Sequence, residues 1–173
     1  LIRDKTSHFV LSPIAELEHE NAHSVVGDWG INAIYPSRQE MNIRCNELNR
    51  ELTSTLDIIG FGLKSFRDSQ TKVITQKVGN GLKLRILTLI PDSIFLAQRE
   101  LDEKVVHGDI KKRIQDLELW VRKLRNVAPN PQNVQLNYYN SLPLDFYWHQ
   151  ENNLFVGPYM YGIDSQKNIT YEF

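Results

Sequence analysis

The sequence predicts an α/β domain with a mixed β-sheet and helices on both faces, preceded by a helical connector. Three observations support this class. Short apolar runs typical of strands alternate with amphipathic segments between residues 31 and 127. The last forty residues change to an alternation with period two, which indicates antiparallel strands joined by hairpins. Strands that alternate with helices favour a partly parallel sheet covered by those helices.

The first half of the expected domain starts with a short strand that stops at Pro36. Ser37 and Glu40 then form a capping box, which predicts the start of a helix. The elements expected here are a strand over 31–35, a helix over 37–52, a strand over 56–63, a helix over 69–78 and a strand over 82–90. This last strand is apolar on both faces near its end, so we expect it at the centre of the sheet.

The second half begins with two helices, over 94–106 and 110–124, followed by a Pro/Asn loop over 126–133. Turn-forming residues at Glu151-Asn152-Asn153 and at Asp164-Ser165-Gln166-Lys167 predict two hairpins. The strands expected around them cover 134–139, 144–149, 154–161 and 169–173.

Residues 1–30 differ from the rest of the chain. Ser12 and Pro13 can start a helix and Gly27 can end it, with only a thin apolar stripe between them. We therefore expect a helical connector over 1–30 and a domain over 31–173. The chain starts with Leu1 and shows no signal-peptide layout, so we expect a piece of a longer protein whose N-terminal part is missing.

The composition excludes several classes of protein. The 173 residues are 41% hydrophobic, enough for a core, and 20 Lys and Arg against 21 Asp and Glu leave a net charge of −1. This balance provides no basic field for nucleic acid or an anionic membrane. Cys45 alone excludes an internal disulfide or a Cys-rich zinc site, so we expect a cytoplasmic protein.

Four short sequence segments, in this order along the chain, resemble those of a known fold: Ile34-Tyr35-Pro36-Ser37-Arg38, Asp57-Ile58-Ile59-Gly60-Phe61-Gly62, Leu84-Arg85-Ile86-Leu87-Thr88-Leu89 and Leu154-Phe155-Val156-Gly157-Pro158-Tyr159. Together with the element order, they resemble the phospholipase D-like fold in a single-copy bacterial form, over about residues 30–173. The resemblance implies a homodimer, because members of this family pair two domains across a dyad.

The catalytic motif of that family is not conserved in this chain. Its members hydrolyse phosphodiesters with H-x-K-x4-D followed by Gly-Ser. Alignment on Gly157 places Pro143 at the histidine, Asp145 at the lysine and Gln150 at the aspartate. Proline cannot act as a nucleophile, so the resemblance implies that phosphodiesterase chemistry is absent. It implies instead a sensor or regulatory domain in a larger bacterial protein, with no cofactor.

Ligands of open α/β sheets bind beyond the carboxyl ends of the strands. Helix N-termini, close-approaching glycines and cations at those ends suit an anion, so we expect a small phosphate-bearing or nucleotide-like ligand. The candidate ligand-binding residues are Tyr35, Ser37, Arg38, Gly60, Gly62, Lys64, Ser65, Asp92, Asp145, Tyr147, Gly157 and Tyr159. Helix capping by itself also accounts for Ser37, and relief of crowding also accounts for the two glycines of the 60–62 loop.

A separate motif supports an alternative function. His19-Glu20-Asn21-Ala22-His23 matches H-E-x-x-H, in which two imidazoles on one helix face hold zinc and the glutamate activates water. This would make the chain a zinc-dependent hydrolase centred on His19, Glu20 and His23, although no third ligand is evident. The other alternative is a protein-interaction or dimerisation module.

Overall fold

A computed structural model describes residues 27–173 of the chain. Residues 33–173 form one compact unit, which is separate from a unit of residues 1–32. The His19-Glu20-x-x-His23 motif lies outside the described residues, as does nearly all of the expected connector.

Seven strands and four α-helices make up the compact unit. In chain order they are β1 (Ala33–Tyr35), α2 (Arg38–Glu51), β2 (Thr55–Ile59), α3 (Lys64–Gly79), β3 (Lys83–Leu89), α4 (Phe95–Asp102), α5 (Asp109–Val127), β4 (Val134–Tyr139), β5 (Asp145–Gln150), β6 (Asn153–Pro158) and β7 (Thr170–Glu172). Short 3₁₀ helices at Pro131–Asn133 and Ser165–Lys167 precede β4 and β7.

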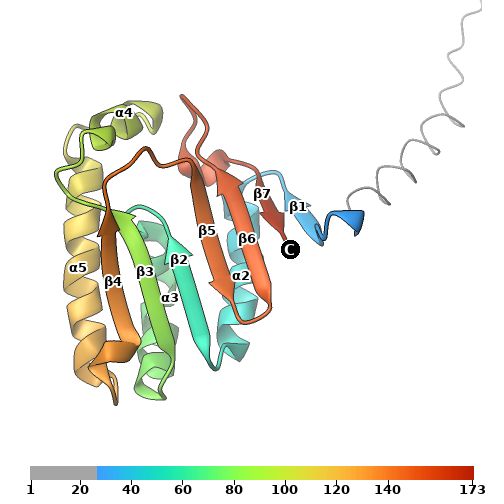
Figure 1. Ribbon diagram of the computed structural model, residues 1–173, viewed down its shortest axis with the longest axis vertical. Coiled ribbons are helices and arrows are strands. Elements are labelled where there is room, and N and C mark those ends of the chain that lie inside the picture. Colours follow the sequence, from blue (N-terminus) through green and yellow to red (C-terminus); the bar gives the residue numbers. More distant parts are fainter. Residues whose placement is uncertain (1–26) are drawn as a thin grey trace, which may run out of the picture. The chain divides into compact units, whose positions relative to one another are not determined.

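The strands form one mixed sheet in the order β1-β7-β6-β5-β2-β3-β4 (Figure 1). β2, β3 and β4 are parallel neighbours, whereas every other pairing is antiparallel. The predicted α/β class, a mixed sheet flanked by helices, is thus confirmed.

The three long helices α2, α3 and α5 all lie on one face of the sheet (Figure 1). Their buried side chains belong to a single hydrophobic cluster with alternate residues of the strands, such as Leu56 and Ile58 of β2 and Leu84 and Ile86 of β3. The strand residues between these, including Arg85, face the other side and are partly or fully exposed. The sequence predicts helices on both faces, whereas the long helices cover only one. The one-sided arrangement follows from topology, because β2, β3 and β4 are added in one direction, and right-handed crossovers in one direction put their helices on one side.

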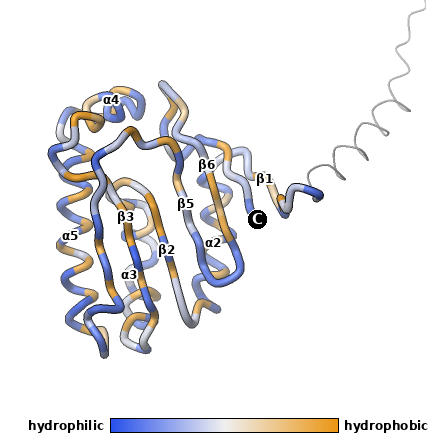
Figure 2. The backbone as a smooth tube through the Cα atoms, in the orientation of Figure 1, coloured by the Kyte–Doolittle hydropathy of each residue, from blue (hydrophilic) through white to orange (hydrophobic). Residues whose placement is uncertain are grey.

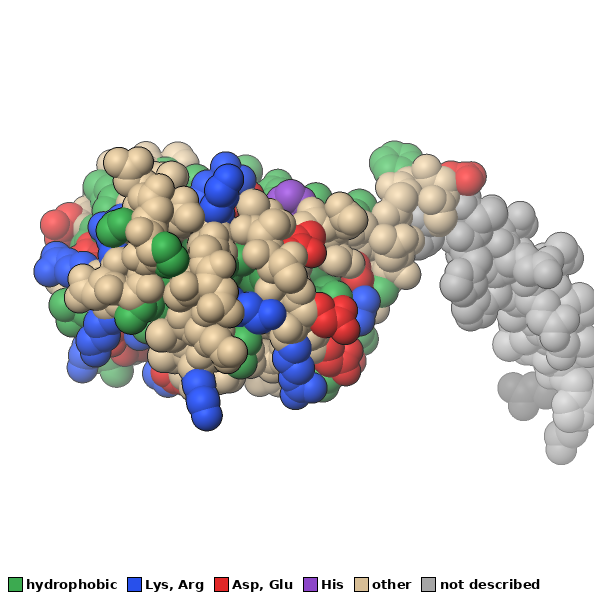
Figure 3. All heavy atoms as spheres, turned by 90° about the horizontal axis from the view of Figure 1, so that it is seen from below, with side chains coloured by type: hydrophobic (Ala, Val, Ile, Leu, Met, Phe, Trp, Pro, Cys, Tyr) green, Lys and Arg blue, Asp and Glu red, His purple; other side chains and the backbone are tan. Residues whose placement is uncertain are grey.

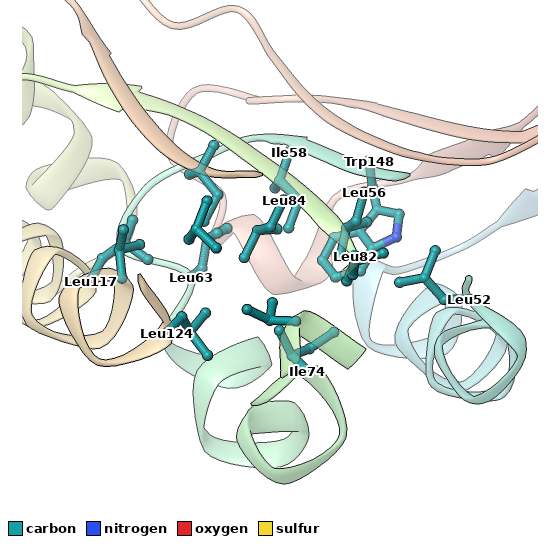
Figure 4. Close-up of a cluster of buried hydrophobic side chains, with 14 of the residues drawn as sticks. Leu52, Leu56, Ile58, Leu63, Ile74, Leu82, Leu84, Leu117, Leu124 and Trp148 are labelled. Carbon is teal, nitrogen blue, oxygen red and sulfur yellow. The ribbon is translucent and has the colours of Figure 1, made fainter. Parts of the chain in front are cut away.

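The core lies between this sheet face and the helices (Figure 4). Figure 2 shows the corresponding alternation of apolar and polar residues along β2, β3 and β5. Leu117 and Leu124 of α5 and Ile74 of α3 meet the apolar residues of the parallel strands there. The predicted N-cap is present, since the Ser37 hydroxyl accepts the Glu40 N–H at 3.3 Å and α2 starts directly after it. The Glu40 carboxylate accepts the Ser37 hydroxyl at 3.1 Å rather than the Ser37 N–H of a full capping box.

Four elements differ clearly from their expected bounds: β2 ends at Ile59 rather than 63, α4 at Asp102 rather than 106 and β6 at Pro158 rather than 161, while α3 starts early. α3 starts at Lys64, five residues earlier than expected, because Gly62 and Leu63 adopt left-handed backbone conformations that turn the chain straight after β2. The second expected hairpin turn contains the 3₁₀ helix Ser165–Lys167, in which the Gln166 N–H donates to the Asp164 carboxylate.

Candidate functional site

A pocket of about 250 Å³ lies where α2 and α3 begin. Such a volume suits a small molecule rather than a macromolecular segment. Five parts of the chain contribute its walls: the first turn of α2, the 61–66 loop with the start of α3, the segment from α4 into α5, β5, and the residues between β6 and β7. The lining residues are Arg38, Asn42, Phe61, Leu63, Lys64, Ser65, Phe66, Glu103, Val105, Arg113, Phe146, Trp148, Tyr159, Asp164, Ser165 and Gln166.

Arg38 is the most unusual of these side chains. It is only 5% exposed, yet its Nε and Nη2 atoms have no hydrogen-bond partner. Its guanidinium lies against the rings of Phe146 and Tyr159. Burial lowers the pKa of Arg38 from its ordinary value, an effect opposed by the nearby Tyr159 hydroxyl and Glu103 carboxylate. A buried cation with two free donors is costly unless an anion pairs with it.

The start of α3 adds a second feature that favours an anion. No side chain caps this sixteen-residue helix, whose first residues Lys64, Ser65 and Phe66 line the pocket. Uncapped first-turn N–H groups and the helix dipole together attract negative charge. The Lys64 ammonium lies 2.7 Å from Asp68 and remains largely exposed.

A buried ionic cluster forms the wall opposite. Glu103 lies 3.5 Å from Arg99 Nε and 3.2 Å from Arg113 Nη1, and the Glu103 and Arg99 side chains are almost fully buried. Arg99 also contacts Asp102 and donates to the carbonyl oxygens of residues 160 and 163. The negative charges of this wall are therefore already paired within the protein, whereas Arg38 makes no ion pair with any described residue.

Tyr159 connects the ionic wall with Arg38. Its ring lies 5.0 Å from the Arg99 guanidinium and 5.1 Å from that of Arg38, and Phe61 stacks beside it at 4.6 Å. Burial raises the pKa of the Tyr159 hydroxyl, so this group is a neutral hydrogen-bonding partner at physiological pH. The pocket thus combines cationic, aromatic and hydroxyl groups.

The remaining wall is polar and uncharged for the most part. The Asn42 amide donates to the Gln166 side chain at 3.2 Å, which ties α2 to the 3₁₀ helix before β7. Asp164 caps that short helix through the Gln166 N–H at 2.8 Å. These amides and Ser165 provide hydrogen-bonding groups on the side of the pocket away from α3.

The structure places four of the predicted ligand-binding residues on the pocket wall: Arg38, Lys64, Ser65 and Tyr159. Gly60 and Gly62 lie in the loop that leads to this wall. A Cβ at Gly62 would come within 2.4 Å of the Arg113 Cβ, so the glycine lets the loop approach α5 closely.

The other six predicted residues do not line the pocket. Tyr35 donates to Glu172, Ser37 caps α2, and the exposed Asp92 pairs with Lys111.

Three of those six lie on β5 and β6. Asp145 and Tyr147 alternate with the inward Phe146 and so face away from the helices. Gly157 is packed against the carbonyl oxygen of Ile169, which a Cβ would approach to 2.9 Å. The ligand-binding residues predicted at the strand ends therefore do not all lie at one pocket.

Several pocket residues were not singled out from the sequence. Arg113 belongs to a basic stretch that reads as a solvated helix face, and Trp148 reads as a packing residue. Gln166 is singled out only as part of a predicted hairpin turn, and Glu103 belongs to no motif. These residues share one property: they belong to segments more than sixty residues from Arg38 in sequence, so only the tertiary fold brings them to the pocket.

No group of three or more His, Cys, Asp or Glu residues that could hold a metal ion occurs within residues 27–173. No helix in this part of the chain is long and apolar enough to cross a membrane.

No family model matches the sequence, and no curated protein matches it. Among solved structures, the chain is similar to TrmBL2, described as an archaeal chromatin protein with a novel mode of DNA binding. The TM-score is 0.48 at 9% sequence identity, and the match covers 94% of this chain but 56% of TrmBL2.

Proposed function

We propose that residues 33–173 form a non-catalytic domain that binds a small anionic ligand, phosphate-bearing or nucleotide-like, in the pocket at Arg38. The observation that carries this proposal is the buried guanidinium with two unpaired nitrogens. A phosphate offers several acceptor oxygens to the planar fork of an arginine, a match that forms strong, charge-assisted hydrogen bonds. The uncapped start of α3 supplies further donors to the same ligand.

The phospholipase D-like resemblance assigns certain positions of this chain to catalysis. The residues at these positions favour ligand binding over hydrolysis. Pro143 is buried, and the Gln150 side chain accepts the indole N–H of Trp148 at 2.7 Å. Neither residue supplies a nucleophile or a general acid. Membership of the phospholipase D-like family remains part of this proposal.

The role proposed for the domain is regulatory, in a larger bacterial protein that works as a homodimer in the cytoplasm. The buried free thiol of Cys45 is compatible with a reducing compartment. A ligand in the pocket would contact both α2 and α3 as well as the segment between α4 and α5. Binding would thus favour one arrangement of these elements over others, which is the physical basis of a population shift.

Isothermal titration calorimetry tests the proposal with matched pairs of probes: AMP and adenosine, glucose 6-phosphate and glucose, with inorganic phosphate alone. We expect at least one phosphorylated probe to bind and its unphosphorylated counterpart not to bind. Arg38→Gln should weaken this binding by about 10- to 100-fold, the loss expected for a charged hydrogen-bonding partner. Arg50→Gln, at an exposed position of the same helix, should leave the affinity unchanged. Failure of every phosphorylated probe, or equal affinity in Arg38→Gln, would contradict the proposal.

A further inference from the structure

Apolar side chains are concentrated on the surface at one end of the domain. Of the fifteen large hydrophobic side chains exposed within the described residues, eight fall in the segments 94–106, 142–144 and 160–163. We call these three segments the α4 surface. Ile94 is 81% exposed, Leu101 72% and Tyr161 83%. Clusters of this kind usually mark an interaction site on a folded protein.

Helix α4 buries ionic side chains in place of a continuous apolar face. Its three ionic residues, Arg99, Glu100 and Asp102, are all buried together with Leu96, as is the adjoining Glu103. Leu101 lies among them in sequence but points to solvent. An isolated surface helix buries its apolar side and exposes its charges, so this helix has the pattern expected when a partner covers its outer face.

Hydrogen bonds hold the three segments together as one surface. Arg99 donates to the carbonyl oxygens of Met160, at 3.3 Å, and Ile163, at 2.9 Å. The Gly162 N–H donates to Asp102, and the Tyr159 N–H donates to the Leu144 carbonyl at 2.8 Å. In Figure 1, α4 and the connections β4–β5 and β6–β7 lie together at the top of the domain. The buried ion pairs therefore fix a preformed apolar surface rather than a loose set of loops.

The charge of this surface indicates what covers it. Lys104 is the only exposed ionic side chain of the α4 surface. A membrane or nucleic-acid surface would call for a cluster of Lys and Arg, which these segments lack. By contrast, the opposite end of the domain, seen in Figure 3, carries both positively charged (blue) and negatively charged (red) side chains. An isologous interface needs a surface that matches itself, and an almost uncharged one meets its copy without like-charge repulsion.

The area is sufficient for a stable pair. At roughly 100 Å² for each large apolar side chain, eight such side chains amount to about 800 Å². This is the area that one partner contributes to a standard-size interface.

We propose that two copies of this chain associate through the α4 surface. The surface borders the pocket, because Glu103 and Val105 line the pocket while Leu101 and Val106 lie on the outside. This inference rests on the homodimer of the proposed function and names its interface, but it does not depend on the proposed ligand. Loss of ligand binding in Arg38→Gln and loss of dimerisation are therefore separate results.

Sedimentation velocity of the full 173-residue chain from 1 to 100 μM tests this inference. We expect a dimer for the wild type, and at least a tenfold rise in the dimer dissociation constant for Leu101→Asp and for Tyr161→Asp. Ile43→Asp and Leu119→Asp alter exposed apolar residues on α2 and α5 and should leave the dimer intact. A wild type that is monomeric throughout, or dimers that persist in both α4-surface variants, would overturn the inference. A monomer that floats with phosphatidylcholine vesicles would also overturn it, by assigning the surface to a membrane.

A second measurement covers the case in which an aspartate variant fails to fold. Tyr161→Cys places a thiol on an exposed loop, while the native Cys45 is buried. Mild oxidation should cross-link Tyr161→Cys into dimers and should not cross-link Leu119→Cys. Equal cross-linking of the two variants would contradict an interface at the α4 surface.

Discussion

The guanidinium of Arg38 lies 4.0 Å from the centre of the Phe146 ring. Phe146 is an inward residue of β5 and Arg38 is in the first turn of α2, so this contact joins helix and sheet at the floor of the pocket. Cation–π attraction of this kind offsets part of the desolvation cost but leaves Nε and Nη2 without acceptors.

Replacing Arg38 should separate binding from stability. In Arg38→Met the unpaired charge is lost and an apolar side chain of similar length remains, so we expect the free energy of unfolding to be unchanged or higher by about 1–4 kcal/mol. Binding of phosphorylated probes should be lost in the same variant. Urea unfolding without ligand, followed by calorimetry with ligand, measures both quantities.

Arg99→Met is the matched comparison. Arg99 is equally buried but is paired with Asp102 and Glu103, so its loss leaves buried carboxylates and should cost about 3–5 kcal/mol. If Arg38→Met destabilised the protein as much as Arg99→Met does, Arg38 would be a structural residue rather than a ligand-binding one.

Gly62 should be much less tolerant of a side chain than another glycine with positive φ. Gly62 has φ +47°, and a Cβ there would lie 2.4 Å from the Arg113 Cβ and 2.8 Å from the Arg113 carbonyl carbon. We expect Gly62→Ala to lower the free energy of unfolding by about 2 kcal/mol more than backbone strain alone, because the loop and α5 must separate. Gly81 has φ +99° with open space around it, so Gly81→Ala should show only the strain, about 1–2 kcal/mol. If urea unfolding shows equal losses of unfolding free energy in Gly62→Ala and Gly81→Ala, the close approach of the Gly62 loop to α5 is disproved.

The contribution of Glu151 to stability should depend on pH. Its carboxylate accepts the Thr53 N–H at 2.7 Å, the Thr53 hydroxyl at 2.8 Å and the Ser54 N–H at 2.9 Å. These bonds, that of the Thr53 N–H first, lower the pKa of Glu151 from its ordinary value of 4.5. The stabilisation is therefore complete above pH 4.5, and it is lost as the pH falls below that value through the folded-state pKa.

Glu151→Gln should accordingly be less stable than the wild type at pH 7, by about 1 kcal/mol. The difference in unfolding free energy should shrink towards zero as the pH falls below about 4.5, the ordinary pKa of a glutamate side chain. Thermal unfolding between pH 3 and pH 7 measures this. Glu51→Gln, at an exposed site near the end of α2, is the matched control, and a difference for Glu151→Gln that stays constant with pH would contradict the assignment.

Glu103 should oppose anion binding while it stabilises the fold. Glu103→Gln removes the negative charge between Arg99 and Arg113, so we expect a loss of about 3 kcal/mol in unfolding free energy. The same change makes the pocket more positive and should tighten the binding of phosphorylated probes several-fold. Calorimetry distinguishes this from simple loosening of the pocket, which would weaken binding. Glu47→Gln, on the exposed side of α2, is the control for both measurements.

The bounds of single elements follow from local sequence. Ser37 and Glu40 specify the start of α2 because capping needs only neighbouring residues. The alternation in Val134–Tyr139 likewise predicts the bounds of β4. α3 is an exception, since its early start depends on the left-handed conformation of Leu63, a residue for which that conformation is unfavourable and hard to anticipate.

The sequence by itself thus determined the α/β class, the order of strands and helices, and the expectation of a cation, Arg38, at a helix start beyond a strand end. Only the tertiary structure decided that the three long helices share one face, because this depends on the order in which strands join the sheet. It also decided that Arg38 is buried without an acid partner, while Glu103 and Arg113 pair with each other. Pairing of this kind depends on distances between residues remote in sequence, and no local pattern encodes those distances.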